Sequence, residues 1–168
     1  MTVAIRPALP HEIEAVREIE RASARRFIGL MDALAADQPS PASILAVRID
    51  AGGLLVAEVD GTLAAFVMFR PVGNGLYIEQ IDVLPAFERR RIGAGLIKTV
   101  AQRARTAGLA RLTLSTFREV PWNAPYYRRL GFTDIDDQKL TPDLAEIRRE
   151  HVLRGLDESA RVFMERGA

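Results

Sequence analysis

The sequence predicts a mixed α/β (α+β) fold in which a mostly antiparallel central sheet of about six or seven strands is flanked by helices. Three observations support this fold class. Residues 54–83 contain three strand-like apolar runs separated by glycine-containing turns. Several other segments repeat apolar residues at helical spacing. One of these, residues 92–107, lies between two predicted strands, so this unit should form one right-handed parallel crossover.

The N-terminal part of the chain is expected to be mainly helical. Residues 3–8 are predicted to form a short first strand, and residues 12–34 a helix with an apolar stripe of slightly irregular spacing. The members of that stripe are Ile13, Val16, Ile19, Ala22, Phe27 and Leu30. Two prolines then interrupt the pattern. Residues 41–49 are predicted to form a second short helix, with Ser40 as its N-cap.

Three consecutive antiparallel strands are expected next. Residues 54–59 and 63–70 are separated by Asp60 and Gly61, which is a strong signal for a tight hairpin. A Gly-Asn-Gly turn then leads into a third strand at residues 76–83.

The second half of the chain is expected to alternate helices and strands. The predicted helices are residues 92–107, 123–130 and 142–154, and the predicted strands are residues 112–116, 132–135 and 161–164. Gly108 should end the first of these helices, while Asn123 and Thr141 should cap the other two. Residues 142–164 either complete the sheet or form a homodimer contact, and the sequence leaves both open. With no linker that would split the chain, residues 1–168 are expected to be a single domain.

Composition narrows the classes of function. The chain of 168 residues has a net charge of +1, so binding to nucleic acid or to a membrane surface would need a local patch. It contains no cysteine, which rules out disulfides, thiolate metal sites and a cysteine acyl-enzyme. The two histidines, His11 and His151, are too isolated to suggest a metal site. With no signal peptide or long apolar run, a soluble cytoplasmic protein is expected.

The first functional motif lies in residues 77–96, which read YIEQIDVLPAFERRRIGAGL. An alternating strand runs into a proline, three consecutive arginines and the glycine-containing start of a helix. At such a junction the first N–H groups of the helix point outward and favour a phosphate. A solvated basic helix start without a ligand would have the same pattern, so this motif alone is weak.

The second motif lies in residues 122–132, which read WNAPYYRRLGF. Together the two motifs resemble the GNAT superfamily of N-acetyltransferases, in which a Val-x-Pro-like strand end precedes a basic glycine-rich loop and a Tyr-x-x-x-Gly-Phe segment follows near the C-terminus. The matching residues are Val83, Pro85, Arg89, Arg90, Arg91, Gly93 and Leu96 in the first motif and Tyr127, Gly131 and Phe132 in the second. The order of elements agrees with the superfamily over residues 3–135.

The loop departs from the superfamily pattern at one position. Members commonly read Gln/Arg-x-x-Gly-x-Gly, and counting from the proline this places Glu88, Arg91 and Gly93 at the named positions. An arginine then stands where the first glycine is usual. A shifted register with Arg90, Gly93 and Gly95 satisfies the motif literally.

We prefer the first register, because it also places Leu96 where the following helix needs an apolar residue. Arg91 is tolerable at the position of the usual glycine if its backbone is already helical, since only a positive φ would require glycine. The arginine side chain could then reach a phosphate.

The resemblance implies acetyl-CoA as co-substrate. It places the pyrophosphate at the arginine-rich loop, and the acyl carbonyl beside the end of the preceding strand, where a backbone N–H is the donor. The implied cofactor-binding residues are Ile81, Asp82, Val83, Arg89, Arg90, Arg91, Ile92, Gly93, Ala94, Gly95 and Asn123. Of these, Asn123 is expected to cap its helix, and by resemblance it also meets the pantetheine arm.

Tyr127 is the candidate catalytic acid. Acyl transfer from a thioester to an amine needs a proton for the departing thiolate. A phenol has a pKa of about 10 and a thiol about 8.5, so this transfer is uphill by only roughly 2 kcal/mol. The alternative is that Tyr127 packs in the core and the adjacent Tyr126 faces the site.

Glu79 is the candidate catalytic base. It shares a strand face with Val83, four residues on, and could deprotonate the amine directly or through water, or attract a cationic substrate. The alternative is a solvated or salt-bridged glutamate. Because the chain has no cysteine, direct attack in a ternary complex is the expected mechanism.

These residues predict an N-acetyltransferase that acts on a primary amine of a small molecule. Three alternatives stay open: a protein N-terminal or lysine acetyltransferase, an inactive sensor of coenzyme A, and a nucleic-acid-binding module that uses the arginine runs. The near-zero net charge argues against the last, and neither nucleic acid nor membrane is an expected partner.

Overall fold

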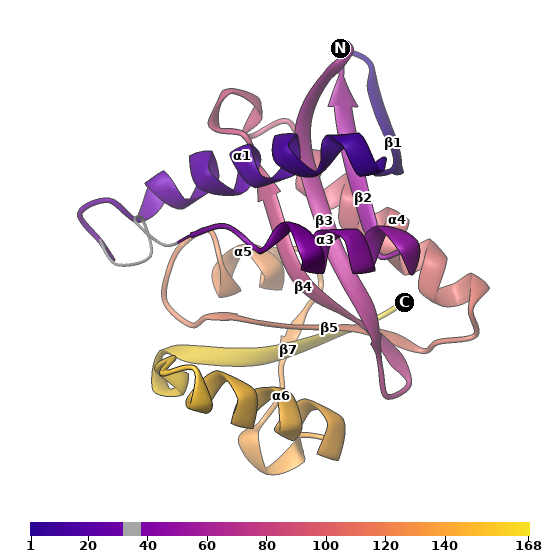
Figure 1. Ribbon diagram of the computed structural model, residues 1–168. Helices are drawn as coiled ribbons and strands as arrows, with labels where there is room; N and C mark the ends of the chain where they lie inside the picture. The colour runs from indigo at the N-terminus through magenta and orange to yellow at the C-terminus, as the bar shows by residue number, and fades with distance from the viewer. Residues whose placement is uncertain (32–37) are drawn as a thin grey trace. The chain divides into compact units, whose positions relative to one another are not determined.

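The structure is a computed structural model that describes residues 1–31 and 38–168. In these residues seven strands form one mixed sheet, in the order β1-β2-β3-β4-β5-β7-β6, with helices beside it (Figure 1). The predicted fold class is therefore confirmed.

Most elements lie close to their predicted positions. The strands are β1 (Val3–Pro7), β2 (Leu54–Val59), β3 (Thr62–Val72), β4 (Gly75–Val83), β5 (Arg111–Phe117), β6 (Thr133–Asp134) and β7 (Arg161–Gly167). The helices are α1 (Ile13–Ala24), α3 (Ala42–Asp50), α4 (Ile92–Thr106), α5 (Ala124–Arg129) and α6 (Pro142–Leu153). Short 3₁₀ turns are η1 (Pro10–Glu12), η2 (Arg25–Phe27), η3 (Pro85–Phe87), η4 (Asp137–Lys139) and η5 (Glu158–Ala160). Within the described ranges, no helix has the length and apolar character needed to cross a bilayer.

The chain divides into two compact units. The first contains Met1–Phe69 and Gln80–Thr99, and the second contains Arg70–Glu79 and Val100–Ala168. Strands β3 and β4 and helix α4 therefore contribute residues to both units. The single domain expected from the sequence stays a prediction.

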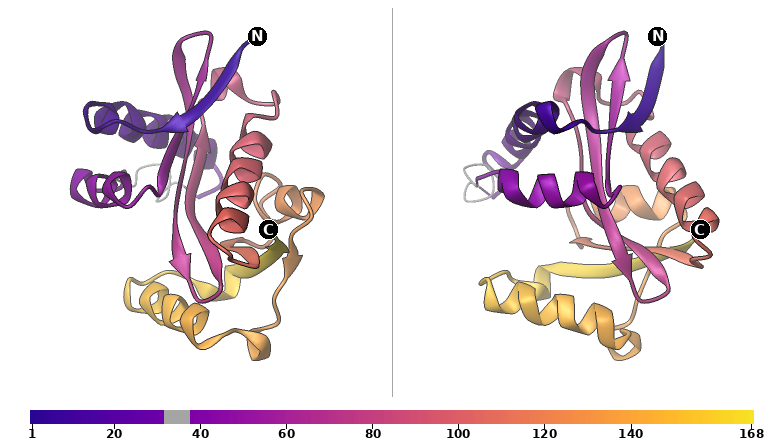
Figure 2. Two further views of the ribbon diagram at one scale, coloured as in Figure 1. Left: turned by 90° about the vertical axis from the view of Figure 1, so that its right-hand side faces the viewer. Right: turned by 45° about the vertical axis from the view of Figure 1, so that its right-hand side comes forward.

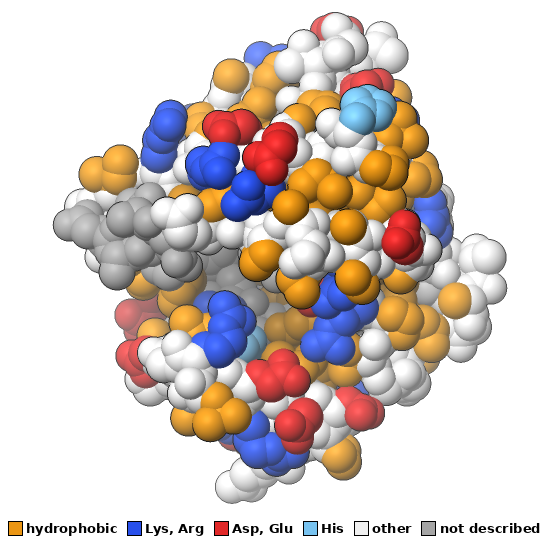
Figure 3. All heavy atoms as spheres, in the orientation of Figure 1, with side chains coloured by type: hydrophobic (Ala, Val, Ile, Leu, Met, Phe, Trp, Pro, Cys, Tyr) orange, Lys and Arg blue, Asp and Glu red, His pale blue; other side chains and the backbone are white. Residues whose placement is uncertain are grey.

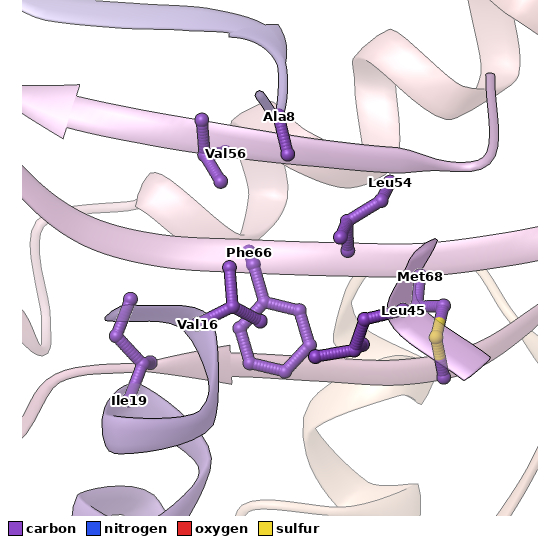
Figure 4. Close-up of a cluster of buried hydrophobic side chains, with 8 residues drawn as sticks. All are labelled: Ala8, Val16, Ile19, Leu45, Leu54, Val56, Phe66 and Met68. Atoms are coloured by element: carbon purple, nitrogen blue, oxygen red, sulfur yellow. The ribbon is translucent and has the colours of Figure 1, made fainter. Parts of the chain in front are cut away.

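In the first unit, α1 and α3 pack on one face of the β2–β3 hairpin, and the start of α4 lies on the opposite face (Figure 2). The cluster under α1 and α3 is apolar and buried (Figure 4); it consists of Ala8, Val16, Ile19, Leu45, Leu54, Val56, Phe66 and Met68. The opposite face of α1 carries the ion pairs Arg17–Glu14 and Arg21–Glu18, and charged side chains of both signs lie next to each other there (Figure 3). This division of faces explains the helical spacing of the stripe.

The hairpin between β2 and β3 turns where the sequence predicts. Asp60 and Gly61 have φ values of 49° and 84°, and Val59 pairs with Thr62. Two successive positive φ values define the tight turn whose twist matches that of the strands.

The predicted length of the first helix is wrong. Helix α1 ends at Ala24 and continues only as the 3₁₀ turn η2; Gly29 then has a φ of 81°. A left-handed residue cannot continue an α-helix. The last two residues of the predicted apolar stripe, Phe27 and Leu30, therefore lie beyond the end of α1. The expected end, Leu34, lies outside the described residues.

Ser40 does not cap α3. The N-cap position is Pro41 and makes no side-chain hydrogen bond, whereas the Ser40 hydroxyl donates to Glu20 Oε1 at 2.8 Å. Ser40 thus stands one residue before the N-cap position, and its side chain is held by α1 instead.

In the second unit, β4 and β5 pair in parallel, as the crossover requires. The pairs run from Gly75 with Arg111 to Ile78 with Leu114, so Glu79 is the first residue of β4 beyond them. Strand β7 pairs antiparallel with both β5 and β6, and therefore completes the sheet. A separate apolar core packs around these strands; its buried members are Tyr77, Ile135, Leu144, Ile147 and Phe163.

Candidate functional site

The arginine-rich loop of the first unit has a strained backbone. It leaves β4, passes through η3 and reaches α4, and Arg89 and Arg91 have φ values of 61° and 59°. The condition under which an arginine fits this position without strain, a helical backbone at Arg91, is therefore not met. A left-handed residue other than glycine costs about 1 kcal/mol, because its Cβ approaches the following carbonyl oxygen. The sequence does not reveal this, since arginine carries no signal for a positive φ.

This geometry supports the register that places Arg91 at the usual glycine. Its φ lies in the region where glycine is unstrained, whereas Gly93 and Gly95 lie inside α4 and are not among the residues with positive φ. Glu88, at the first position of the motif, is held by Arg26, whose Nε lies 2.8 Å from Glu88 Oε1.

The start of α4 presents backbone donors. The Gly95 N–H donates to the Arg91 carbonyl at 3.1 Å, so the N–H groups of Ile92, Gly93 and Ala94 lie in front of this first helical hydrogen bond. Such a helix start suits a phosphate, because its N–H groups and the helix dipole both favour negative charge.

The three arginines of the loop are exposed. Among the described residues, none of them forms an ion pair with a carboxylate. Arg90 lies over the Phe87 ring at 5.2 Å. Their positive charges are thus not neutralised within the described chain, and the loop fits a group with two negative phosphates.

The end of β4 holds one unusual carboxyl group. Asp82 accepts hydrogen bonds from Ser23 Oγ at 2.9 Å and from Gln80 Nε2 at 2.7 Å. Burial raises its pKa to about 7, although these two hydrogen bonds oppose the shift. On either side of it, Ile81 and Val83 are half-buried, and the Val83 carbonyl accepts from Arg26 Nη2 at 2.9 Å. The sequence identified Asp82 only as a member of the cofactor strand.

In the second unit, Tyr127 lies on α5 and is 8% exposed. Its ring makes edge contacts with Tyr126 at 5.4 Å and with Phe132 at 5.8 Å between centroids. Gly131 ends the helix with a φ of 94°, as predicted. The aromatic contacts fix the ring plane, and Tyr127 is the more buried of the two tyrosines.

Asn123 occupies the N-cap position of α5 as predicted, but its side chain makes no capping hydrogen bond. Its backbone carbonyl accepts from the Tyr127 N–H at 3.0 Å, which joins the two candidate residues along one helix turn. Its Oδ1 is buried and has no hydrogen-bond partner among the described residues. A buried acceptor without a donor is costly, so this atom fits an amide donor of a bound cofactor.

Glu79 is paired with a cation. Arg70 Nε lies 3.4 Å from Glu79 Oε2, the Glu79 side chain is 17% exposed, and the Arg70 guanidinium also lies 5.9 Å from the centre of the Tyr77 ring. Burial raises the pKa of Tyr77 to about 12, so this phenol is neutral. The salt-bridged alternative for Glu79 therefore describes its geometry in the second unit.

Polar groups around β7 were missed by the sequence analysis. His151 pairs with Glu158 through Nδ1 and stacks on Phe163, while Arg161 Nε donates to Ser115 Oγ at 3.2 Å. Burial lowers the pKa of His151, so the ring stays neutral over a wider pH range. No spacing in the sequence signals this arrangement, because β7 and η5 bring together residues from three separate segments.

Several solved structures share the fold. PaiA N-acetyltransferase from Thermoplasma acidophilum, in complex with coenzyme A, has a TM-score of 0.75 at 16% identity and full coverage (100%) of both chains. N-acetylglutamate synthase from Neisseria gonorrhoeae, complexed with coenzyme A and N-acetyl-glutamate, has a TM-score of 0.74 at 17% sequence identity. The match covers 99% of this chain and 35% of that chain. The ribosomal-protein-S18-alanine N-acetyltransferase from Escherichia coli has a TM-score of 0.65 at 17% sequence identity, and the match covers 99% of this chain and 94% of that chain.

A sequence profile of the acetyltransferase (GNAT) family matches residues 13–132. This range contains both motifs, the arginine-rich loop and the Tyr127 segment, and covers more than half of the chain. The chain belongs to the acetyltransferase (GNAT) family and is an acyl-CoA-dependent acetyltransferase.

Proposed function

We propose that this protein moves an acetyl group from acetyl-CoA to a primary amine of a small molecule, by direct attack in a ternary complex. The observation that carries the proposal is the loop before α4, in which two strained arginines precede three N–H groups outside the helical hydrogen-bond ladder. Backbone strain of this kind is retained where a ligand site needs it. The proposal keeps the cytoplasmic location that the sequence predicts.

The residues of each unit have separate tasks in this proposal. When bound, acetyl-CoA supplies an activated acyl group as a thioester. In the first unit, the N–H groups at the start of α4 and the arginines before it bind the pyrophosphate, and a backbone N–H of residues 81–83 donates to the acyl oxygen. In the second unit, Asn123 Oδ1 accepts from an amide of the pantetheine arm.

Proton transfer is assigned to tyrosine and carboxylate side chains. We assign Tyr127 as the acid that protonates the departing thiolate. Glu79 stays a candidate base, directly or through water; its ion pair with Arg70 supports the other role that the sequence left open, attraction of a cationic acceptor. No thiol in the chain could form an acyl-enzyme, which supports direct attack.

The acceptor of the acetyl group is proposed to be a small-molecule amine. Of the structures similar to this chain, one is complexed with N-acetyl-glutamate and another acts on a ribosomal protein's alanine. We favour a small molecule, in agreement with the sequence prediction. A protein acceptor or a sensor without turnover would each be revealed by the following test.

The test is release of free thiol from acetyl-CoA in the presence of a panel of small amines and of peptides with free N-termini. Release that depends on a small amine supports the proposal. Release with peptides alone would assign a protein acceptor, and binding of acetyl-CoA in calorimetry without release would assign a sensor.

Tyr127→Phe tests the catalytic acid, with Tyr126→Phe as the matched control. If Tyr127 protonates the thiolate, its loss should lower kcat by on the order of 100-fold while acetyl-CoA binding in calorimetry is unchanged. Tyr126→Phe removes the neighbouring hydroxyl on the same helix and should leave kcat within about twofold. The reverse result would transfer the role to Tyr126.

A further inference from the structure

Asp82, on β4 of the first unit, is hydrogen-bonded by polar side chains from α1 and from its own strand. Ser23, on the last turn of α1, is 4% exposed and donates to Asp82 Oδ1, while Gln80 donates to Oδ2 from the same strand. Each carboxyl oxygen thus has one hydrogen bond and retains capacity for a second. The two hydrogen bonds therefore hold the Asp82 carboxyl group in place and leave each oxygen able to accept another hydrogen bond.

The charged neighbours of Asp82 are engaged elsewhere. Arg26, from η2, directs Nε to Glu88 and Nη2 to the Val83 carbonyl. Glu20, one turn before Ser23 on α1, accepts from the Ser40 hydroxyl. Among the described residues, Asp82 therefore has no ion pair with Arg26 or with any other cation.

This environment makes the carboxyl group a proton acceptor near neutral pH. Its pKa is raised to about 7: burial is the largest cause and Glu20 acts in the same direction, while the two hydrogen bonds and Arg26 oppose the shift. A base is most effective when its pKa is near the working pH. Side chains alternate along a strand, so Asp82 and Glu79 belong to opposite faces of β4, and only Glu79 is ion-paired.

We propose that Asp82 is the catalytic base that takes the proton from the acceptor amine. The inference rests on the proposed acetyl transfer. A bond forms between the amine nitrogen and the acyl carbon, and the carbon–sulfur bond breaks. The nitrogen gives one proton to the Asp82 carboxylate, and the thiolate receives one from Tyr127. The nitrogen becomes more acidic as its bond to carbon forms, so a carboxylate of this strength is sufficient.

The first experiment is the pH dependence of kcat/KM for wild type and Asp82→Asn, with an amine found active in the thiol-release test. Wild type should gain activity through a titration near pH 7. The asparagine variant keeps the shape and a hydrogen-bonding side chain but cannot accept the proton. We expect it to lose about 100-fold at pH 8 and to lose this titration. Two acceptors of different amine pKa separate the enzyme's titration from the substrate's own.

Two further variants keep the inference falsifiable should Asp82→Asn fold poorly. Ser23→Ala removes one hydrogen bond that lowers the pKa of Asp82, so the titration should move to higher pH. Glu79→Gln lies on the opposite face of the same strand and should leave the position of the titration unchanged.

The outcomes separate this inference from the proposed function. An active wild type whose titration disappears in Glu79→Gln but persists in Asp82→Asn overturns the role of Asp82 and leaves acetyl transfer standing. Asp82→Asn activity within threefold of wild type at pH 8 does the same. A wild type that releases no thiol with any amine overturns the proposed function itself.

Discussion

The backbone of Arg91 links the stability of the protein to its function. Its φ of 59° is a conformation that glycine adopts freely and arginine adopts at a cost. The exposed guanidinium lies at the start of α4, where the proposal places the pyrophosphate. An arginine at this position therefore exchanges some stability for a positive charge in the loop.

Arg91→Gly should separate these two effects. Relief of the left-handed strain contributes about 1 kcal/mol and offsets the greater entropy of glycine in the unfolded chain, so we expect the free energy of unfolding to stay close to that of wild type. Acetyl-CoA affinity should fall about fivefold with the loss of a charge-assisted contact. Urea unfolding and calorimetry measure the two quantities.

Arg90→Gly is the matched control, since Arg90 is not among the residues with positive φ. Glycine there should lower stability through the greater entropy of the unfolded chain. Equal stability changes in both variants would contradict the strain at Arg91.

The raised pKa of Asp82 should also make the stability of the protein depend on pH. Its pKa is raised in the folded state, so the folded protein binds this proton more tightly than the unfolded chain does. The stability that protonated Asp82 provides is complete below the unfolded pKa of about 4 and is lost as the pH rises through about 7. Asp82→Asn should therefore become more stable relative to wild type between pH 5 and pH 8 in urea unfolding. A difference that does not change with pH would contradict the raised pKa.

At the scale of elements, an ion-pair network joins β1, η1 and β2. Arg6 makes two hydrogen bonds to Glu12, at 2.8 and 2.7 Å, and one to Glu58 at 2.8 Å. Glu12 Oε1 also accepts from the Leu9 N–H at 2.8 Å. The network connects the start of α1 to the edge of the sheet in the first unit.

Glu12→Gln should destabilise the protein most at neutral pH. The hydrogen bonds from Arg6 lower the pKa of Glu12 to about 2, so its stabilising effect is present above about pH 4.5 and is lost as the pH falls toward 2. With its side chain only 7% exposed, we expect a loss of about 2 kcal/mol at pH 7 in urea unfolding. Glu14→Gln removes an ion-pair partner that is 68% exposed and should cost less than about 0.5 kcal/mol. Equal losses in the two variants would contradict the importance of the partly buried network around Arg6.

Elements with strong local signals were predicted well. The Asp60-Gly61 pair correctly predicted a hairpin, and Gly108 and Gly131 correctly predicted the ends of two helices. The three glycines, Gly61, Gly108 and Gly131, all have a positive φ. The end of α1 and the cap at Ser40 were predicted wrongly, and Asn123 stands at its predicted N-cap position without making the capping hydrogen bond. Each of these depends on long-range partners or on the surrounding chain, such as Glu20 for Ser40, that the local sequence does not show.

At the scale of the whole molecule, the sequence predicted the fold class and the family because two separated motifs agreed. It could not predict the environment of Asp82, because Ser23 lies 59 residues away on α1. Nor could it predict the ion pair of Glu79 with Arg70, which needs the neighbouring strands. The positive charge of Arg128 is paired with Asp134, at 2.9 Å between Nη2 and Oδ2. This ion pair weakens the case for a basic surface that binds nucleic acid.

The most direct test of acetyl transfer to a small amine is to follow the acetyl group itself. Purified protein is incubated with acetyl-CoA labelled in the acetyl group and with the small amines, and the label is located by mass spectrometry. We expect the label in an acetylated small amine, with formation dependent on Tyr127 and Asp82. Label that stays on coenzyme A, or that enters only protein or peptide amines, would contradict it.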